Sequence, residues 1–270
     1  MREKCYQRER REAEAVRDPR AQDTTLDYVI GPIDAVEAAA FIAKYEWLGT
    51  VNTNPLARYC ARNAAGEVVA VALFGRPTVQ SAGLCRKIED ISNQSDEDKA
   101  YLATAVCLER GACAHWAHPH TASWFISRVL KLAHKERGWT VFYAYSDMEA
   151  GEIGAVYQAC GWMYLGQGIG RNRTAGVARP RDYFRHRDWP ENKWASSRVF
   201  YRLGLKVNEH VGRKCGQDFN GGLSDTRPWE WKETVAKHNY VKIVCPKLIK
   251  ALRYPPLPYP KRPTSLRPPL

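Results

Sequence analysis

One stretch of the sequence, residues 138–161, constrains the fold more than any other. It reads GWTVFYAYSDMEAGEIGAVYQACG. The run Trp139–Tyr145 is uncharged and rich in aromatic and β-branched residues, which predicts a buried strand. After it, apolar residues recur at the spacing of one helix face, and Gly161 is placed to end that helix. These apolar residues are Ile153, Val156, Tyr157 and Cys160.

Polar side chains follow this strand where it ends, at Tyr145, Ser146 and Asp147. In open α/β sheets, ligands bind and chemistry takes place at that edge of the sheet. We therefore expect Asp147 to be a catalytic carboxylate with Tyr145 beside it. The alternative is that Asp147 only caps the helix that follows the strand.

The rest of the pattern predicts a mixed α/β sheet with helices on both faces. The order is strand, helix, hairpin, strand, helix, strand, helix, strand, which is also the element order of the GNAT acyltransferase fold. Residues 26–170 are expected to form this catalytic domain, after a charged N-terminal arm at 1–25. Residues 171–270 are expected to be a basic extension rich in Trp, Tyr and Pro, with one strand at Tyr240–Val244.

The charge is concentrated in that extension. Residues 171–270 hold 22 Lys and Arg against 8 Asp and Glu, whereas the first 170 residues hold 19 against 21. Basic residues interleaved with aromatic ones suit phosphate contact together with base stacking, although a solvated basic surface is the alternative. The expected nucleic-acid contacts are Arg171, Arg173, Arg181, Arg185, Arg187, Trp189, Lys193 and Trp194.

Several compartments and partners are disfavoured by composition. No uncharged apolar run approaches the roughly 20 residues that span a bilayer, so no membrane partner is expected. The N-terminus carries charges where a signal peptide needs an apolar stretch. The eight cysteines form no CxxC pair, so the simplest setting is a reducing cytoplasm.

Two further groups of residues are candidates for chemistry. At the end of the first predicted helix, Glu46 could serve as a general base if burial raises its pKa, and the Trp47 beside it belongs either to the core or to the site. The loop histidines His115, His118 and His120 could bind a metal ion, or they could serve packing or phosphate contact.

The donor-binding turn of the GNAT fold is missing here. Such a turn is rich in glycine because backbone N–H groups must reach the pyrophosphate of acyl-CoA at a helix N-terminus. The corresponding segment, His118–Trp124, contains no glycine. The helix start and the hydroxyl of Ser123 could still bind an anion, but acyl-CoA is disfavoured as the donor.

Several segments together resemble the Mom-like proteins of phages, a branch of the GNAT superfamily that modifies adenine in DNA. The segments are Tyr45–Thr50, Val71–Pro77, Leu108–Ala112 with His115 and Trp116, Tyr145–Asp147, Gly151–Gly154 and Val156–Gln158. The resemblance implies conversion of adenine N6 to a carbamoylmethyl derivative, which protects phage DNA from restriction in the cytoplasm of the infected host. By position it implicates Glu46 with Trp47, Ser123 and Asp147, although the family has histidine and tyrosine in place of Glu46 and Trp47.

The substrate implied by the resemblance is double-stranded DNA, and the donor is open. A carbamoylmethyl group is an isomer of a glycyl group, so glycyl transfer followed by rearrangement would give the product. Glycyl-tRNA is therefore a chemically attractive donor, and acetyl-CoA is the other. The adenine would be flipped out of the duplex into a pocket where we expect Tyr45, Trp47 and Trp116 to bind the base.

Two other interpretations compete with this one. The protein could be an acyl-CoA-dependent N-acetyltransferase acting on another amine, which would bind CoA and need no DNA. It could also be a non-catalytic nucleic-acid-binding protein on a GNAT scaffold, which would tolerate changes at Asp147 and Ser123. The uneven charge argues against the first alternative, and the polar cluster at the strand end argues against the second.

Overall fold

The structure is a computed structural model of the 270-residue chain. It describes residues 5–15, 26–49, 51, 54–77, 95–168, 181–188, 195–196, 229–234, 236–250 and 252–261. The chain forms two compact units. Unit 1 comprises residues 1–169 together with 237–270, and unit 2 comprises residues 170–236.

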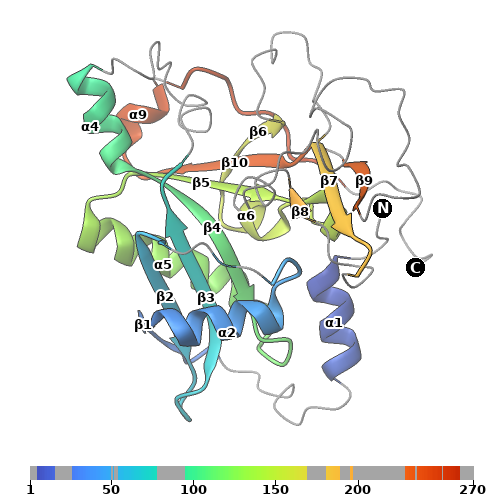
Figure 1. Ribbon diagram of the computed structural model, residues 1–270. Coiled ribbons are helices and arrows are strands. Elements are labelled where there is room, and N and C mark those ends of the chain that lie inside the picture. Colours follow the sequence, from blue (N-terminus) through green and yellow to red (C-terminus); the bar gives the residue numbers. More distant parts are fainter. Residues whose placement is uncertain are drawn as a thin grey trace, which may run out of the picture. The chain divides into compact units, whose positions relative to one another are not determined.

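Unit 1 is built on a seven-stranded sheet with the order β1-β2-β3-β4-β5-β10-β6 (Figure 1). The strands are β1 (Val29–Pro32), β2 (Ala57–Arg62), β3 (Val68–Gly75), β4 (Ala105–Cys113), β5 (Val141–Ser146), β6 (Met163–Gln167) and β10 (His238–Ile243). β4 and β5 are parallel, and every other neighbouring pair is antiparallel. The predicted class, a mixed α/β sheet with helices on both faces, is confirmed.

Local sequence fixes one end of each of the two longest helices of unit 1, α2 and α5. Asp34 accepts hydrogen bonds from the backbone N–H groups of Val36 and Glu37, so it fixes the start of α2. Gly138 ends α5 in the left-handed conformation, with φ 68°. The helices are α1 (Tyr6–Ala15), α2 (Ala35–Tyr45), α4 (Asp96–Thr104), α5 (Thr121–Arg137), the 3-10 turn η2 (Met148–Ala150), α6 (Ala155–Ala159) and α9 (Pro246–Lys250).

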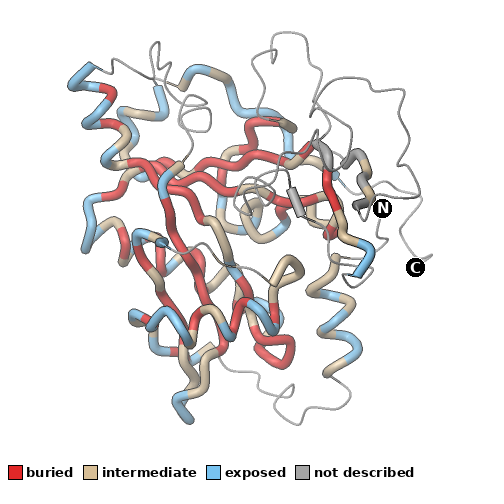
Figure 2. Tube along the Cα trace, viewed as in Figure 1, coloured by how far each residue is buried: buried red, intermediate tan, exposed pale blue. Residues whose placement is uncertain are grey.

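The central strands are buried on both faces (Figure 2). In β5, Phe142 and Ala144 belong to the core cluster that includes residues of α2 and α5. Val141 and Tyr143 belong to a second cluster, with residues of α4 and α9. Successive side chains of a strand point to opposite faces, so a strand that is covered on both faces needs apolar residues at every position. This explains the continuous apolar run seen in the sequence.

The C-terminal boundary of the sheet differs from the prediction. The sequence places the strand near Tyr240 in the 171–270 extension, but β10 lies inside the central sheet, between β5 and β6. Residues 237–270 therefore belong with the sheet, and the inserted unit is 170–236. The strand itself can be predicted from local sequence. Its pairing with β5 cannot, because that contact joins residues about a hundred positions apart.

The N-terminal arm, predicted as a charged segment, contains a helix. α1 carries ion pairs between residues four apart, Arg8 with Glu12 and Arg10 with Glu14, and such pairs add modestly to helix stability. The remainder of the predicted arm, residues 1–4 and 16–25, lies outside the described residues.

Unit 2 contains a small antiparallel sheet with the order β8-β7-β9. Its strands are β7 (Arg181–His186), β8 (Ala195–Ser196) and β9 (Trp229–Thr234). Tyr183 and Phe184 of β7 are buried. In the described parts of both units, no helix is long and apolar enough to cross a membrane.

Candidate functional site

β4 and β5 stop pairing with each other half-way along their length. Their register runs from Ala105 opposite Val141 to Leu108 opposite Ala144. Beyond that point β4 continues beside β3, and β5 continues beside β10. A shift in the β3–β4 register leaves Glu109 as an extra residue between Leu108 and Arg110, and such bulges bend a strand away from its neighbour. The carboxyl ends of the two parallel strands therefore diverge.

Asp147 lies at this divergence, directly after β5. Its side chain is only 6% exposed, and Oδ2 lies 2.6 Å from the Nζ atom of Lys237. Oδ1 accepts a hydrogen bond of 3.0 Å from the backbone N–H of Glu149, so Asp147 also caps η2. Asp147 therefore caps η2, whereas α6, the helix expected after the strand, begins after Gly154 without a side-chain cap. The same carboxylate additionally holds a cation.

Lys237 links this carboxylate to the ends of the inserted unit. It is the first residue after unit 2 and immediately precedes β10. Its carbonyl accepts a hydrogen bond of 2.9 Å from the N–H of Gly168, just before the insertion. The amide of Asn239 also donates to the carbonyls of Gly166 and Gly168, at 2.8 and 2.7 Å. These bonds fix the position of Lys237 next to Asp147.

Glu46 contributes a second carboxylate from the end of α2. Its Oε2 accepts hydrogen bonds of 2.9 Å from the backbone N–H groups of Leu48 and Gly49. Burial raises the pKa of Glu46, while the positive charges of Arg110 and Lys237 and the two hydrogen bonds oppose that rise. Glu46 therefore lies within the electrostatic reach of Lys237, the partner of Asp147.

Glu152 is the third carboxylate of the site. Burial, followed by the negative charges of Glu46 and Asp147, raises the pKa of Glu152 to about 7, against a smaller opposing effect of Lys237. We call Glu46, Arg110, Asp147, Glu152 and Lys237 the charge cluster. Sequence reasoning missed Arg110, Glu152 and Lys237, because no spacing rule joins residues from β4, the segment after η2 and the start of β10.

The backbone on both sides of Glu152 is rigidly held. Gly151 and Gly154 have φ of 69° and 74°, a conformation that favours glycine. Between them, the carbonyl of Ile153 accepts hydrogen bonds from the hydroxyl of Tyr240 at 2.6 Å and from the amide of Gln158 at 2.9 Å. A Cβ atom on Gly154 would clash with the Tyr240 ring. These contacts therefore hold the backbone of Glu152 in a fixed position beside the other residues of the charge cluster.

Replacing Gly154 by alanine is expected to destabilise unit 1 by about 3 kcal/mol, because a left-handed residue with a side chain costs roughly 1–2 kcal/mol and overpacking adds to this. Gly66→Ala is the matched control, since Gly66 has φ of 80° but a Cβ atom added there would meet nothing within 4 Å. It should cost only about 1 kcal/mol. Urea unfolding of both variants measures the difference. Equal losses of stability in the two variants would show that the Tyr240 ring moves aside for the added methyl group.

Two of the predicted base-binding residues are part of the core. Tyr45 and Trp116 are 6% and 4% exposed, and the Tyr45 ring packs against the rings of Phe41 and His115. Their rings are therefore largely covered by protein. Among the predicted aromatic residues of the site, Trp47 and Tyr145 are half-buried and lie next to Glu46 and Asp147 in the chain.

Ser123 lies in the first turn of α5 and has other contacts. Its hydroxyl donates to the carbonyl of His120 at 3.2 Å, and its own carbonyl accepts from the thiol of Cys160 at 3.4 Å. Within the described residues, no contact joins Ser123 to the charge cluster. Its neighbour Thr121 is fully buried and its hydroxyl has no hydrogen-bond partner there. Ser123 therefore stays a predicted site residue without a structural link to Asp147.

Of the three loop histidines, His118 and His120 lie together, with ring centroids 5.4 Å apart. Nδ1 of His115 lies 2.8 Å from Oε2 of Glu14 on α1. Nδ1 of His118 instead accepts a hydrogen bond of 3.1 Å from the backbone N–H of His120. Across the described residues, no group of three or more His, Cys, Asp or Glu is placed to hold a metal ion. The metal interpretation of this loop is not supported by its geometry.

Most of the predicted nucleic-acid contacts lie outside the described residues. Arg171, Arg173, Trp189, Lys193 and Trp194 lie outside the described residues, and Arg181 is described only as a backbone position in β7. The guanidinium of Arg185 is ion-paired with Glu230, with Nη2 and Oε2 2.5 Å apart. Arg187 is exposed just after β7.

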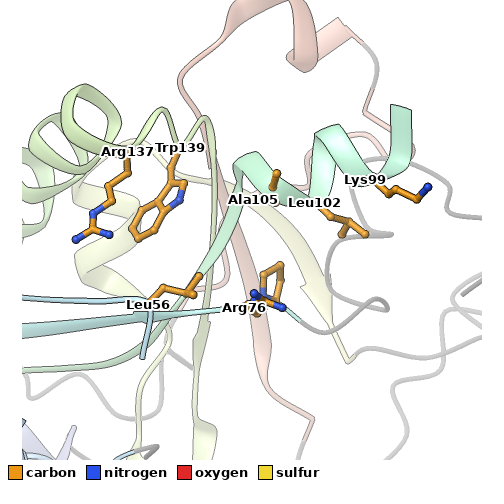
Figure 3. A pocket seen from close by; sticks show the side chains of 9 residues that line it. Leu56, Arg76, Lys99, Leu102, Ala105, Arg137 and Trp139 are labelled. Carbon is orange, nitrogen blue, oxygen red and sulfur yellow. The ribbon is translucent and has the colours of Figure 1, made fainter. Parts of the chain in front are cut away.

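A cavity of about 680 Å³ lies at the other end of the central strands (Figure 3). Its lining includes Ala105 at the start of β4 and Trp139 just before β5, whereas Asp147 follows the end of β5. Arg76, Lys99 and Arg137 also line it, and Figure 3 shows Arg137 and Trp139 on one side with Lys99 on the other. None of the residues predicted for the site lines this cavity.

Comparison with known proteins identifies the family. The sequence profile of the Mom protein family matches residues 27–261, which include every strand of the central sheet. The chain belongs to the Mom protein family. No curated protein matches the sequence significantly.

Solved structures with a similar arrangement include N-acetyltransferases. A spermidine N-acetyltransferase from Vibrio cholerae, in complex with CoA and spermine, is 9% identical, with coverage of 80% of this chain and 96% of that chain and a TM-score of 0.38. An IAA acetyltransferase from Bacillus cereus is 10% identical, with coverage of 80% and 99% and a TM-score of 0.38. At these TM-scores the matches support no argument about this chain.

Proposed function

We propose that this Mom-family protein is a transferase that modifies adenine N6 in DNA, giving a carbamoylmethyl derivative that protects phage DNA from restriction. The observation that carries the proposal is the charge cluster, which gathers three carboxylates and Lys237 where β4 and β5 diverge. Adenine N6 is a weak nucleophile because its lone pair is delocalised into the ring. A site that orients this amino group and removes its proton suits that chemistry.

The base must leave the duplex to reach such a site. Trp47 and Tyr145 are the half-buried aromatic residues that neighbour Glu46 and Asp147, so they are the candidates to stack on the flipped adenine. Lys and Arg of residues 171–270 outnumber Asp and Glu by 14, which favours contact with phosphates. The reaction would take place in the cytoplasm of the infected host.

The donor is an activated two-carbon acyl group. Glycyl-tRNA supplies both the carbon and the nitrogen of the carbamoylmethyl product, and the basic segment suits tRNA as well as DNA. Acetyl-CoA is the alternative donor, although the segment before α5 has no glycine for a pyrophosphate turn. Purified protein offered plasmid DNA with each donor separately distinguishes the two.

Nucleoside mass spectrometry of DNA from cells that express the protein tests the proposed function. We expect a deoxyadenosine that is heavier by one glycyl or carbamoylmethyl unit, which have the same mass. Unmodified DNA from a soluble, well-expressed protein would contradict the proposal. It would favour transfer to another amine or a nucleic-acid-binding protein without catalysis, and saturable CoA binding would then select the former.

A further inference from the structure

The three carboxylates of the charge cluster differ in the groups that they already bind. Asp147 is paired with Lys237 through Oδ2 and with the N–H of Glu149 through Oδ1, and its side chain is 6% exposed. Glu46 binds two backbone N–H groups through Oε2. Glu152 is half-buried, and its carboxylate accepts a hydrogen bond from the backbone N–H of Asp147. Of the three carboxylates, Glu152 carries the fewest of these contacts and is held directly beside Asp147, so it is the one best placed to exchange a proton with a bound molecule.

We propose that Glu152 is the catalytic residue that takes the proton lost by adenine N6 during transfer, while Asp147, held by Lys237, orients the amino group. This inference rests on the proposed function and assigns the proton transfer within the same site. It differs from the expectation based on sequence, in which Asp147 was the working carboxylate and Glu152 had no role.

The surroundings of Glu152 support this assignment. Asp147 and Glu46 face it with negative charge, from the end of β5 and the end of α2, and Lys237 faces it with positive charge from the start of β10. The Tyr157 ring of α6 lies close enough for the Glu152 charge to raise the pKa of Tyr157, after the larger effect of burial. A carboxyl group with a pKa of about 7 is half-ionised at neutral pH, the condition in which proton transfer in both directions is most effective.

The rigid backbone supplies the geometry. Gly151 and Gly154 adopt left-handed conformations on either side, and Tyr240 and Gln158 hold the carbonyl of Ile153. The N–H of Glu152 also donates 3.1 Å to the carbonyl of Asp147. A general base needs a fixed position relative to the atom it deprotonates, and these constraints fix Glu152 relative to Asp147.

The step balances with an acyl ester or thioester as donor. N6 attacks the acyl carbon, the N6–C bond forms, and the proton from N6 moves to the carboxylate of Glu152. The bond from the acyl carbon to the ester oxygen or thioester sulfur then breaks. The leaving oxygen or sulfur keeps the electron pair and receives the proton from Glu152, which returns to its ionised form.

The pH dependence of modification tests the assignment. Purified protein is incubated with plasmid DNA and with a clarified bacterial extract that supplies the donor. The pH ranges from about 5.5 to about 8.5, which brackets the pKa of Glu152 of about 7. The amount of modified deoxyadenosine is then measured. A base must be ionised, so the wild-type rate should rise with pH through about 7. Glu152→Gln should lower the rate about 100-fold and abolish that rise. Glu136→Gln, in the last turn of α5, is the matched control and should leave both unchanged.

A second measurement does not depend on any donor. Because burial and like charge favour the protonated form of Glu152, the raised pKa means that stability is lost as pH rises from the unfolded value of 4.5 through about 7. Glu152→Gln should therefore unfold about 5 °C above wild type at pH 8, and most of this difference should vanish at pH 5. Glu136→Gln should show no such pH-dependent difference.

The outcomes separate this inference from the proposed function. A wild-type protein that leaves DNA unmodified would count against the proposed function, and the unfolding measurement would still test the environment of Glu152. A wild-type protein that modifies DNA, with a Glu152→Gln variant that keeps the rise through pH 7, would overturn the role of Glu152 alone. Equal unfolding temperatures at pH 8 would overturn the electrostatic basis of that role.

Discussion

Asp147→Asn is expected to abolish DNA modification, with a loss of about 1,000-fold or more, while DNA affinity stays within a few-fold of wild type. Asparagine keeps the shape and can still accept from the N–H of Glu149, so the fold around η2 should persist. It removes the negative charge that holds Lys237 at 2.6 Å. The amino group of adenine would then lose its charged acceptor and its orientation, and misplacement of a reacting group is costly.

Mass spectrometry of plasmid DNA measures the modification, and DNA binding at two salt concentrations measures affinity. Asp96→Asn is a suitable control, because Asp96 is a fully exposed carboxylate that pairs with Lys99 on α4. An Asp147→Asn protein with wild-type activity would refute the role of this carboxylate. A protein that loses DNA binding in parallel would instead indicate that Asp147 supports the binding surface.

The framework of the fold could be predicted because its determinants are local. The run Trp139–Tyr145 is apolar on both faces because two core clusters enclose β5. Asp34 and Gly138 set the ends of α2 and α5 through their own side chain and backbone conformation. Each of these signals lies within a few residues of the structure it specifies, so sequence reasoning recovers it.

The candidate site could be predicted only in part, for the opposite reason. Asp147 was identifiable because it follows a buried strand, and Glu46 because it ends a helix. Lys237 was not, since its position depends on β10 entering the sheet between β5 and β6. Tyr45 and Trp116 were misplaced because an aromatic residue next to a polar one has the same local sequence in a core as in a pocket. The structure shows that both residues are buried, with the Tyr45 ring packed against Phe41 and His115.

Lys237→Met is expected to destabilise unit 1 by about 3 kcal/mol. The variant leaves the buried carboxylate of Asp147 without its cation, and breaking one side of a buried ion pair costs roughly 3–5 kcal/mol. We expect the lower end of this energy range because the side chain of Lys237 is 20% exposed. The substitution should also raise the pKa values of Glu46 and Glu152 further, because the positive charge of Lys237 opposes the rise in both.

The double variant Lys237→Met with Asp147→Asn separates stability from function. In the double variant both side chains are neutral, so no buried charge lacks a partner. It should therefore recover most of the stability that Lys237→Met loses, while it still fails to modify DNA. Lys242→Met is the matched control, since the Lys242 amino group binds the carbonyls of Cys160 and Gly161 at 3.1 Å. It should cost about 1 kcal/mol, and Asp147→Asn should not relieve that cost. If Lys237→Met were equally unrelieved, Lys237 would stabilise the fold through its other contacts, and the ion pair with Asp147 would have no special place in the site.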